Sequence, residues 1–391
     1  MKRLLEIKNV SAGYVVDKKT NVVVADACLS LCGGQLVSML GANGAGKSTL
    51  LRTIAGTQRP LQGDVLVDGK SLKSMSRKEL AKMVSVVSTD RTQAGGLTVE
   101  ELVGLGRQPH TGFLGRLDSS DREIVAEAME AVGISHKAEK FVAELSDGER
   151  QKAMIARAVA QQTPVILLDE PTSFLDVASR VDVLQLLHRL AYNEGKAILL
   201  SSHDVSLSLS LSDRLWLLLP GGVIVDGQTE DLVLSGRLDE LFLSRSVTFD
   251  MLTGEFAAVL PAGHRSVALR CSDPSLSHWA TNALLRSGYA VGDDGKVEVS
   301  VVSATDISVG GRRCSSFARM LGALEVESNA HVVVLSCQPH SHFKRGVVGV
   351  VGNRRHQSDK LFDVDGERHA VAVFLQISLL VAVGSRNAYL R

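Results

Sequence analysis

Three things are scarce or missing in this chain of 391 residues: an excess of charge, paired cysteines and long apolar runs. Lysine plus arginine and aspartate plus glutamate both total 43, so the formal net charge is zero. This balance argues against a general nucleic-acid binder, because such proteins usually carry a basic excess. The cysteines number five and follow no framework spacing, which is typical of a reducing compartment.

The shortness of the apolar runs bears on location. Residues 1–8 contain no apolar core of the kind that a secretory signal requires. The longest apolar stretch, residues 370–383, is interrupted by Gln376 and is too short to span a bilayer. We therefore expect a soluble, cytoplasmic protein, unless a membrane-embedded partner holds it.

The first part of the chain has the pattern of an α/β protein. Short β-like runs alternate with glycine turns over residues 4–40, and helical blocks occupy residues 98–160. Short apolar runs alternate with helical segments again over residues 165–219. This order predicts an α/β domain with an N-terminal β part and a helical insertion.

The pattern breaks near residues 245–260, where glycine and proline turns accumulate. We expect a first domain over residues 1–247, whose helical subdomain covers about 98–160, and a small accessory α/β domain over residues 250–337. The tail, residues 338–391, has weak periodicity. Its histidines could bind metal or haem or be ordinary surface residues, and the tail could also come from a shifted reading frame.

A glycine-rich loop is the strongest local signal in the sequence. Residues 41–49 read G-A-N-G-A-G-K-S-T, which fits G-x-x-x-x-G-K-[ST], between an apolar strand and a helix. Glycines allow successive backbone N–H groups to point at phosphate oxygens, and the helix start adds partial positive charge. Lys47 would reach the β- and γ-phosphates, and Ser48 would bind Mg²⁺. The candidate nucleotide-binding residues here are Gly41, Asn43, Gly44, Ala45, Gly46, Lys47, Ser48 and Thr49.

Two acidic residues follow a second apolar strand. Residues 165–168 are V-I-L-L, and Asp169 and Glu170 come directly after them. The carboxyl end of a buried strand in such a sheet lies where ligands bind. We expect Asp169 to hold Mg²⁺, directly or through water, and Glu170 to polarise the attacking water.

Residues 145–151, L-S-D-G-E-R-Q, precede a helix rich in alanine and arginine. Ser146, Gly148 and the helix start together could form a second anion site. The segment resembles the signature motif L-S-G-G-Q of the ATP-binding cassette family, from which Asp147 and Glu149 depart. The order of loop, signature and acidic strand is also that of the family.

Three further residues match positions of this family. Asp176 ends S-F-L-D at residues 173–176, which resembles the D-loop, and His203 follows a strand as the switch histidine does. Tyr14 stands where an aromatic ring stacks on adenine. Each has a simpler interpretation: Tyr14 as a packed strand-end aromatic, His203 as a helix-capping histidine, and Asp176 as a helix N-cap.

The resemblance covers residues 3–243 and implies a P-loop NTPase cassette with an N-terminal antiparallel β subdomain. It implies an ATPase that uses ATP and Mg²⁺ and whose copies dimerise head to tail, so that Ser146 and Gly148 of one copy face the nucleotide of the other. The implied catalytic residues are Glu170, His203 and Lys47. The implied nucleotide contacts add Tyr14, Ser146, Gly148 and Asp176 to the loop, and the implied metal contacts are Ser48, Asp169 and Thr89.

Thr89 marks a departure from the family pattern. The family has a glutamine after the strand that corresponds to residues 84–87, and the alignment places Thr89 there, with Gln93 four residues later. That glutamine contacts Mg²⁺ and couples to the membrane partner. Either Thr89 or Gln93 could take its place, so the coupling step is in question more than nucleotide binding.

Residues 105–116 contain G-R-Q-P followed by a second G-R, which resembles importers of iron–siderophore complexes, haem and cobalamin. The stretch is expected to shape a docking surface. This resemblance implies an integral-membrane permease and, indirectly, a substrate-binding protein as partners, at the cytoplasmic face of the inner membrane. The alternatives are a soluble, non-transport ATPase of the same family, or a weakly hydrolysing nucleotide-dependent regulator.

Overall fold

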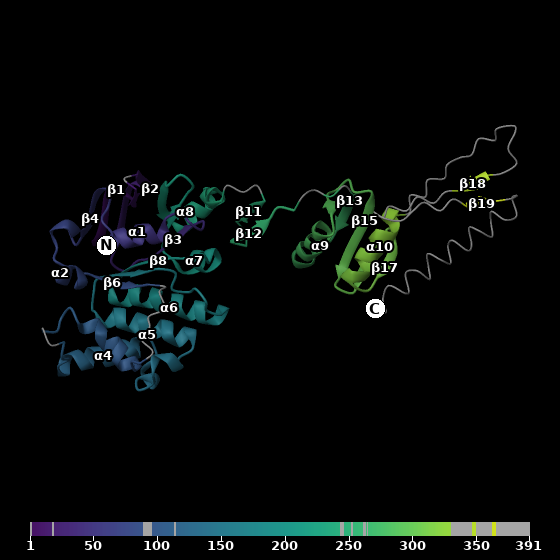
Figure 1. The fold of residues 1–391 in the computed structure, drawn as a ribbon. Coiled ribbons are helices and arrows are strands. Elements are labelled where there is room, and N and C mark those ends of the chain that lie inside the picture. The colour runs from purple at the N-terminus through teal and green to yellow at the C-terminus, as the bar shows by residue number, and fades with distance from the viewer. Residues whose placement is uncertain are drawn as a thin grey trace. The chain divides into compact units, whose positions relative to one another are not determined.

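The structure is a computed structural model that describes residues 2–17, 19–88, 96–112, 115–242, 246–251, 253–260, 263, 265–329, 346–348 and 362–364. The chain divides into two compact units, Met1–Val259 and Leu260–Arg391, which are taken separately below (Figure 1). Among the described residues, no helix combines the length and the apolarity needed to cross a bilayer.

An antiparallel sheet opens the first unit. Its strand order is β2-β1-β4-β5. Buried residues such as Leu5 and Ile7 alternate along β1 with more exposed ones, as expected for a sheet with one face in the core. Its strands are β1 (Arg3–Val16), β2 (Lys19–Cys32), β4 (Gln62–Val67) and β5 (Lys70–Ser71).

A six-stranded sheet forms the centre of the unit, with the order β10-β9-β3-β8-β7-β6. All its neighbours pair in parallel except β10 and β9. All four residues of β7 are buried, as is usual for a parallel strand covered on both faces. Its strands are β3 (Leu36–Gly41), β6 (Val84–Val87), β7 (Val165–Leu168), β8 (Ala197–Ser201), β9 (Arg214–Leu218) and β10 (Ile224–Gln228).

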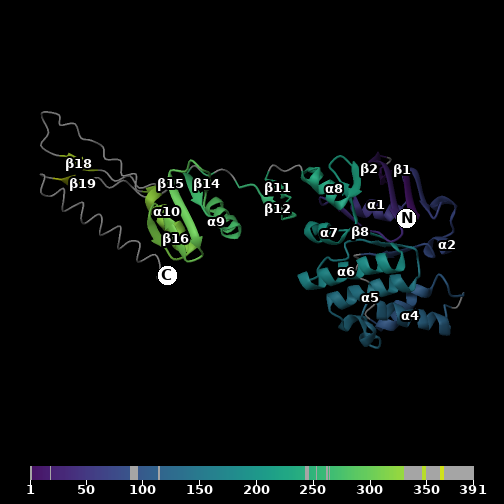
Figure 2. The same ribbon diagram turned by 180° about the vertical axis from the view of Figure 1, so that it is seen from behind.

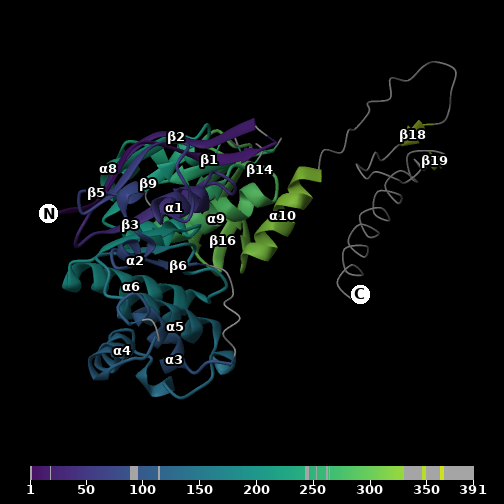
Figure 3. The same ribbon diagram turned by 60° about the vertical axis from the view of Figure 1, so that its left-hand side comes forward.

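Helices cover the two faces of this sheet. Figure 3 shows α1 beside β3 on one side and α3 to α6 gathered on the other, and Figure 2 shows α4 to α6 together on that second side. Several helices begin at a capping box, for example Asp118 with Asp121 in α4. The helices are α1 (Lys47–Ile54), α2 (Arg77–Ala81), α3 (Val99–Gly104), α4 (Ser119–Ala131), α5 (Asp147–Ala160), α6 (Val177–Glu194), α7 (Val205–Leu211) and α8 (Thr229–Leu234). The 3₁₀ turns are η1 (Leu72–Ser74), η2 (Leu105–Arg107), η3 (Ser135–Lys137), η4 (Val142–Glu144) and η5 (Arg237–Leu241).

The first unit ends in a hairpin of β11 (Val247–Asp250) and β12 (Glu255–Ala258). Phe249 is buried in a cluster with Leu238 and Leu241, and its ring centroid lies 5.2 Å from that of Phe256. The boundary expected between residues 247 and 250 therefore falls inside this hairpin. The aromatic side chains keep the hairpin with the first unit, which extends to Val259.

The second unit contains a five-stranded sheet with the order β14-β13-β15-β16-β17 and a core of its own. The strands at its centre, β13 and β15, are parallel, as alternation of strands and helices predicts. Its elements are β13 (Arg265–Arg270), α9 (Pro274–Arg286), β14 (Tyr289–Val291), β15 (Val297–Ser303), β16 (Asp306–Val309), β17 (Arg312–Cys314), α10 (Phe317–Asn329), β18 (Gly346–Val348) and β19 (Phe362–Val364). Apart from β18 and β19, the tail expected at 338–391 lies outside the described residues.

Candidate nucleotide-binding site

The glycine-rich loop joins the end of β3 to the start of α1. Gly44 and Gly46 have φ angles of +79° and +104°, which favour glycine. Val23 of β2 closes over the loop, since a Cβ on Gly46 would lie 2.3 Å from the Val23 Cγ1. Among the described residues, the N–H groups of Gly44, Gly46 and Lys47 have no acceptor. These donors at a helix start fit a phosphate group.

Lys47 lies beneath the loop, with 5% of its surface exposed. Its Nζ donates to the carbonyl oxygens of Gly41 at 2.8 Å and of Ala42 at 3.2 Å. Burial lowers the pKa of Lys47, and the neighbouring charges of Glu170 and Asp169 oppose that shift. The ammonium group of Lys47 therefore lies close enough to Glu170 and Asp169 for their charges to act on it.

The two acidic residues follow β7, two strands away from β3. The Ser48 hydroxyl donates to the Asp169 Oδ1 at 3.1 Å, which brings the loop and the acidic strand together. Their oxygen atoms fit Mg²⁺, a hard cation that prefers oxygen ligands. Ser48 and Asp169, each expected to contact Mg²⁺, thus lie within hydrogen-bonding distance of each other.

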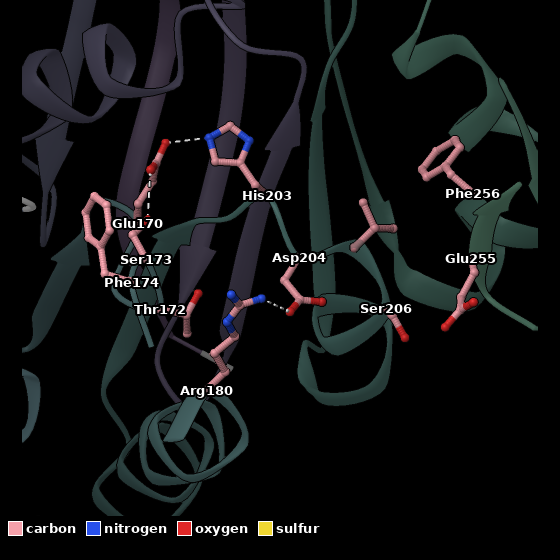
Figure 4. Close-up of a pocket in the computed structure, with 11 residues that line it drawn as sticks. Glu170, Thr172, Ser173, Phe174, Arg180, His203, Asp204, Ser206, Glu255 and Phe256 are labelled. Atoms are coloured by element: carbon pink, nitrogen blue, oxygen red, sulfur yellow. Dashed lines mark hydrogen bonds and ion pairs between the residues drawn. The ribbon is translucent and has the colours of Figure 1, made fainter. Parts of the chain in front are cut away.

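Glu170 has a φ angle of +47° and contacts two side chains (Figure 4). Its Oε1 lies 2.5 Å from the His203 Nε2, and its Oε2 accepts from the Ser173 hydroxyl at 3.0 Å. About a quarter of the Glu170 side chain is exposed (27%), so a water molecule can reach it. His203 does not cap α7, because the N-cap is Asp204.

Ser201, which sequence reasoning missed, completes this set. It ends β8, between the strands of the loop and of the acids. Its hydroxyl donates to the Asp169 Oδ1 at 2.7 Å and accepts from the Glu170 N–H at 2.9 Å. The only signal in the sequence is a pair of serines that ends an apolar run just before His203.

A cavity of about 620 Å³ opens beside Glu170 and His203. Figure 4 shows Arg180 and Asp204 on its wall, and Glu255 and Phe256 of β12 at its far side. The Arg180 Nη1 lies 3.5 Å from the Asp204 Oδ2. The hairpin that ends the first unit therefore borders the same space as the acidic residue. This leaves room for a further group next to the Glu170 carboxylate.

The signature-like segment begins α5, where Ser146 is the N-cap. The Glu149 Oε2 accepts from the Ser146 N–H at 2.9 Å and from its hydroxyl at 3.1 Å. The Glu149 Oε1 pairs with the Lys137 Nζ at 2.9 Å. The bond to Lys137 and those to Ser146 lower the pKa of Glu149 to about 2. Gly148 lies against Ser179 of α6.

Comparisons with known proteins agree with this geometry. The profile of the ABC transporter family matches residues 24–173. An ABC transporter ATP-binding protein from Methanocaldococcus jannaschii, described as uncharacterised, is 39% identical over 65% of this chain and 86% of its own length. The chain belongs to the ATP-binding cassette family. It is an ATPase of the fold expected from the sequence.

Other members of the ATP-binding cassette family align over most of their length. The iron(3+)-hydroxamate import ATP-binding protein of Bacillus subtilis is 38% identical over 56% of this chain and 82% of its own. The ferric enterobactin transport ATP-binding protein of Escherichia coli is 34% identical over 64% and 90%.

Two solved cassettes have the same fold. One chain of an ABC transporter of metal-chelate type, in an inward-facing conformation, aligns with a TM-score of 0.55 at 27% identity over 66% of this chain and 96% of its own. A dimeric, post-hydrolysis cassette bound to ADP and Pi aligns with a TM-score of 0.51 at 27% identity over 58% and 99%.

Three family positions remain outside the group around Glu170. Asp176 caps α6 by accepting from the Ser179 N–H at 2.7 Å, which agrees with its simpler interpretation, and this bond lowers its pKa. Tyr14 is 48% exposed on β1, opposite Asn21 of β2. Thr89 and Gln93, the two candidates for the family glutamine, lie outside the described residues.

One residue of the G-R-Q-P segment, Arg107, has a structural role inside the helical part of this cassette. Arg107 is buried, with 5% of its surface exposed. Its Nε donates to the Asp121 Oδ1 at 2.9 Å, and its Nη1 donates to the Ala160 carbonyl at 2.8 Å. The bond to Arg107 lowers the pKa of Asp121. The arginine therefore ties η2 to α4 and to the end of α5.

Proposed function

We propose that this ATPase powers a membrane importer of iron–siderophore, haem or cobalamin-type cargo. The observation that carries its hydrolytic part is the Glu170 carboxylate, held by His203 and Ser173 beside Lys47 and Asp169. The siderophore and cobalamin cargoes rest on relatives whose names specify import of iron(3+)-hydroxamate, petrobactin or cobalamin. Haem rests on the resemblance of residues 105–116 alone.

In this proposal, the loop N–H groups and Lys47 bind the β- and γ-phosphates of ATP. Ser48 and Asp169 would hold Mg²⁺, which supplies charge neutralisation on the phosphates when bound. Glu170 orients a water molecule and takes up its proton, and His203 fixes the Glu170 carboxylate. Tyr14, exposed on β1, stacks on the adenine ring.

A second copy completes the site in this proposal. Ser146 and Gly148 at the start of α5 would approach the nucleotide of the other copy, with Asp176 near the junction. Within one copy, no hydrogen bond or ion pair between described residues joins Ser146 to the glycine-rich loop. A solved cassette of similar fold is dimeric with ADP and Pi bound, which supports this arrangement.

The remaining partners are an integral-membrane permease and, through it, a substrate-binding protein. The protein would then act at the cytoplasmic face of the inner membrane. The exposed apolar side chains of Leu105 and Phe141, in the helical part, suit contact with another protein.

Uptake in a strain that lacks the gene tests this function. Radiolabelled iron–siderophore, haem and cobalamin are offered separately to cells that carry the wild-type chain, Glu170→Gln or Arg52→Ala, an exposed residue of α1 that serves as control. We expect the wild type and Arg52→Ala to restore uptake of one cargo class and Glu170→Gln to restore none. Restoration of no cargo by the wild type, or full uptake with Glu170→Gln, would contradict the proposal.

A further inference from the structure

We propose that Ser201 is a positioning residue for hydrolysis, because its one hydroxyl group holds both acidic residues of the site. The inference rests on the proposed roles of Asp169 as a metal ligand and Glu170 as the base. It adds a residue at the end of β8 to a site whose phosphate- and metal-binding residues come from the loop and the end of β7.

The fold fixes where Ser201 can act. It is the last residue of β8, which lies between β3 and β7 in the central sheet. In the ladder, Ser201 stands opposite Met39, two residues before the glycine-rich loop begins, and Leu200 stands opposite Leu168, which precedes Asp169. The Ser201 side chain is fully buried. Because Ser201 is buried, its hydroxyl forms hydrogen bonds with the protein groups around it.

The Ser201 hydroxyl makes one hydrogen bond to each of the two acidic residues. A serine hydroxyl has one proton to donate and lone pairs to accept. The proton goes to the Asp169 Oδ1 at 2.7 Å, and a lone pair accepts the Glu170 N–H at 2.9 Å. One atom thus sets the spacing between a carboxylate and the backbone of the next residue.

The effect on Asp169 is orientation. Its Oδ1 accepts from two hydroxyl groups, those of Ser201 and Ser48. Of these, Ser201 comes from the sheet and Ser48 from the helix that follows the loop, so the Ser201 bond is independent of loop position. Groups that orient a ligand in this way typically change metal affinity or activity about 10- to 100-fold when they are removed.

The effect on Glu170 is to hold an unfavourable backbone conformation. Its φ angle of +47° is uncommon for a residue with a side chain, and such conformations persist only where the surroundings enforce them. The end of β8 contacts Glu170 twice, through Ser201 at the N–H and through His203 at the Oε1. Without the Ser201 bond, we expect the Glu170 carboxylate to lose its fixed direction.

A purely structural serine would behave differently, and Ser38 provides the comparison. Ser38 is also fully buried, lies on the neighbouring strand β3, and bonds the Ser212 hydroxyl at 2.6 Å without touching either acid. Ser201→Ala and Ser38→Ala remove the same group from the same sheet. Only the first removes it from the acids.

The test uses the full chain and two readouts. The first is the Kd of a fluorescent ATP analogue, measured with Mg²⁺ and with EDTA, and the second is kcat at saturating ATP and Mg²⁺. For Ser201→Ala, we expect the Kd in EDTA divided by the Kd in Mg²⁺ to fall about 10-fold, towards one. We expect kcat to fall about 10-fold or more. We expect Ser201→Thr, which keeps the hydroxyl, to recover both, and Ser38→Ala to change neither.

Two further variants keep the outcome clear. Ser201→Cys keeps the volume with a weak donor, so it should show the same losses if Ser201→Ala does not fold. Asp169→Asn tests the role on which the inference rests. If Asp169→Asn abolishes the Mg²⁺ effect while Ser201→Ala and Ser201→Cys do not alter it, the inference about Ser201 is wrong and the proposed function stands. If Asp169→Asn leaves the Mg²⁺ effect intact, the proposed role of Asp169 is wrong. Equal losses in Ser38→Ala would also overturn the inference.

Discussion

The polar side chains at the carboxyl edge of the central sheet bond to residues from other elements, whereas Ser146 at the start of α5 bonds within its own turn. At the sheet edge, residues from the ends of two strands, β7 and β8, and from the first turn of α1 contact one another. Ser48, Asp169, Glu170, Ser201 and His203 form a continuous chain of hydrogen bonds. At the start of α5, the hydrogen bonds that Ser146 makes to other described residues stay within its own turn, mainly with Glu149, and Glu149 pairs with Lys137.

This difference indicates which parts of the site one chain can form alone and which need a second chain. At the sheet edge, the phosphate donors, the acids and the histidine all come from one chain and lie together. The α5 start is folded and charge-balanced, but its serine is occupied within its own capping box. We infer that one chain builds the hydrolytic half by itself and that the signature half functions only against another chain.

The largest effect is expected at the sheet edge. Lys47→Ala should weaken ATP binding about 100-fold or more, because it removes charge-assisted contacts to the phosphates and the bonds that close the loop. Titration with a fluorescent ATP analogue measures this, with Arg52→Ala of the same helix as control. Retained affinity in Lys47→Ala would mean that the loop binds phosphate without its lysine.

A change at the far end of α5 should affect stability rather than binding. Arg107→Met leaves Asp121 without its buried partner, which typically costs about 3 to 5 kcal/mol in the free energy of unfolding. Urea unfolding measures the loss, and ATP affinity of the folded fraction should stay near that of the wild type. A loss of affinity without a loss of stability would show that Arg107 acts on the site.

Two shortened chains, one with and one without the hairpin of β11 and β12, test its role in stability. A chain ending at Val259 should bind ATP with near-native affinity, since every residue of the site precedes it. A chain ending at Ser246 loses Phe249 from its buried cluster and should be less stable by about 3 to 5 kcal/mol. Thermal unfolding of the two chains checks this. Equal stability would show that the hairpin is not part of the folded core of the first unit.

The smallest effect is expected at the α5 start. Lys137→Met leaves the Glu149 carboxylate unbalanced beside Ser146, so ATP-driven association of two chains should weaken several-fold, while binding to one chain is unchanged. Glu149→Gln, which restores the family residue, should rescue Lys137→Met, and Lys140→Met is the exposed control. If the double variant is as weak as Lys137→Met alone, the charge of Glu149 is not the cause.

The pH dependence of that effect has a defined sign. The folded pKa of Glu149 is lowered from 4.5 to about 2. Its carboxylate therefore contributes to the free energy of unfolding above pH 4.5, and this contribution is lost as the pH falls towards 2. The difference between Lys137→Met and the wild type should therefore be the same at pH 6 and at pH 8. A difference that grows over this range would point to another group.

Much of the site was predictable because its signals are local. The loop at residues 41–49 is a contiguous motif, and the strand before Asp169 is an uninterrupted apolar run whose bounds the structure reproduces. Ser201, Arg107 and the hairpin were not predictable in the same way. The partners of Ser201 lie 31 and 32 residues away in the sequence, and Asp121, the partner of Arg107, lies 14 residues away. Phe249 of the hairpin packs in a cluster with Leu40 and Leu215. Only the tertiary packing brings these residues together.

The sequence around Lys137 gave no sign of its pairing either. Its partner Glu149 lies in the signature-like segment, where the family has glutamine, and the ion pair explains how an acid is tolerated there. The departure in the motif and the lysine are thus one feature, visible only once η3 and α5 are folded against each other.

The mass of Glu170→Gln in solution tests the central claim most directly. This variant keeps the phosphate-binding loop but lacks the base, so ATP should accumulate unhydrolysed and hold two chains together. With ATP and Mg²⁺, light scattering should give twice the chain mass of 41.8 kDa, and without nucleotide it should give 41.8 kDa. Adding Ser146→Arg should return the nucleotide-bound protein to the single-chain mass. Glu170→Gln that binds ATP and stays at 41.8 kDa would contradict the account.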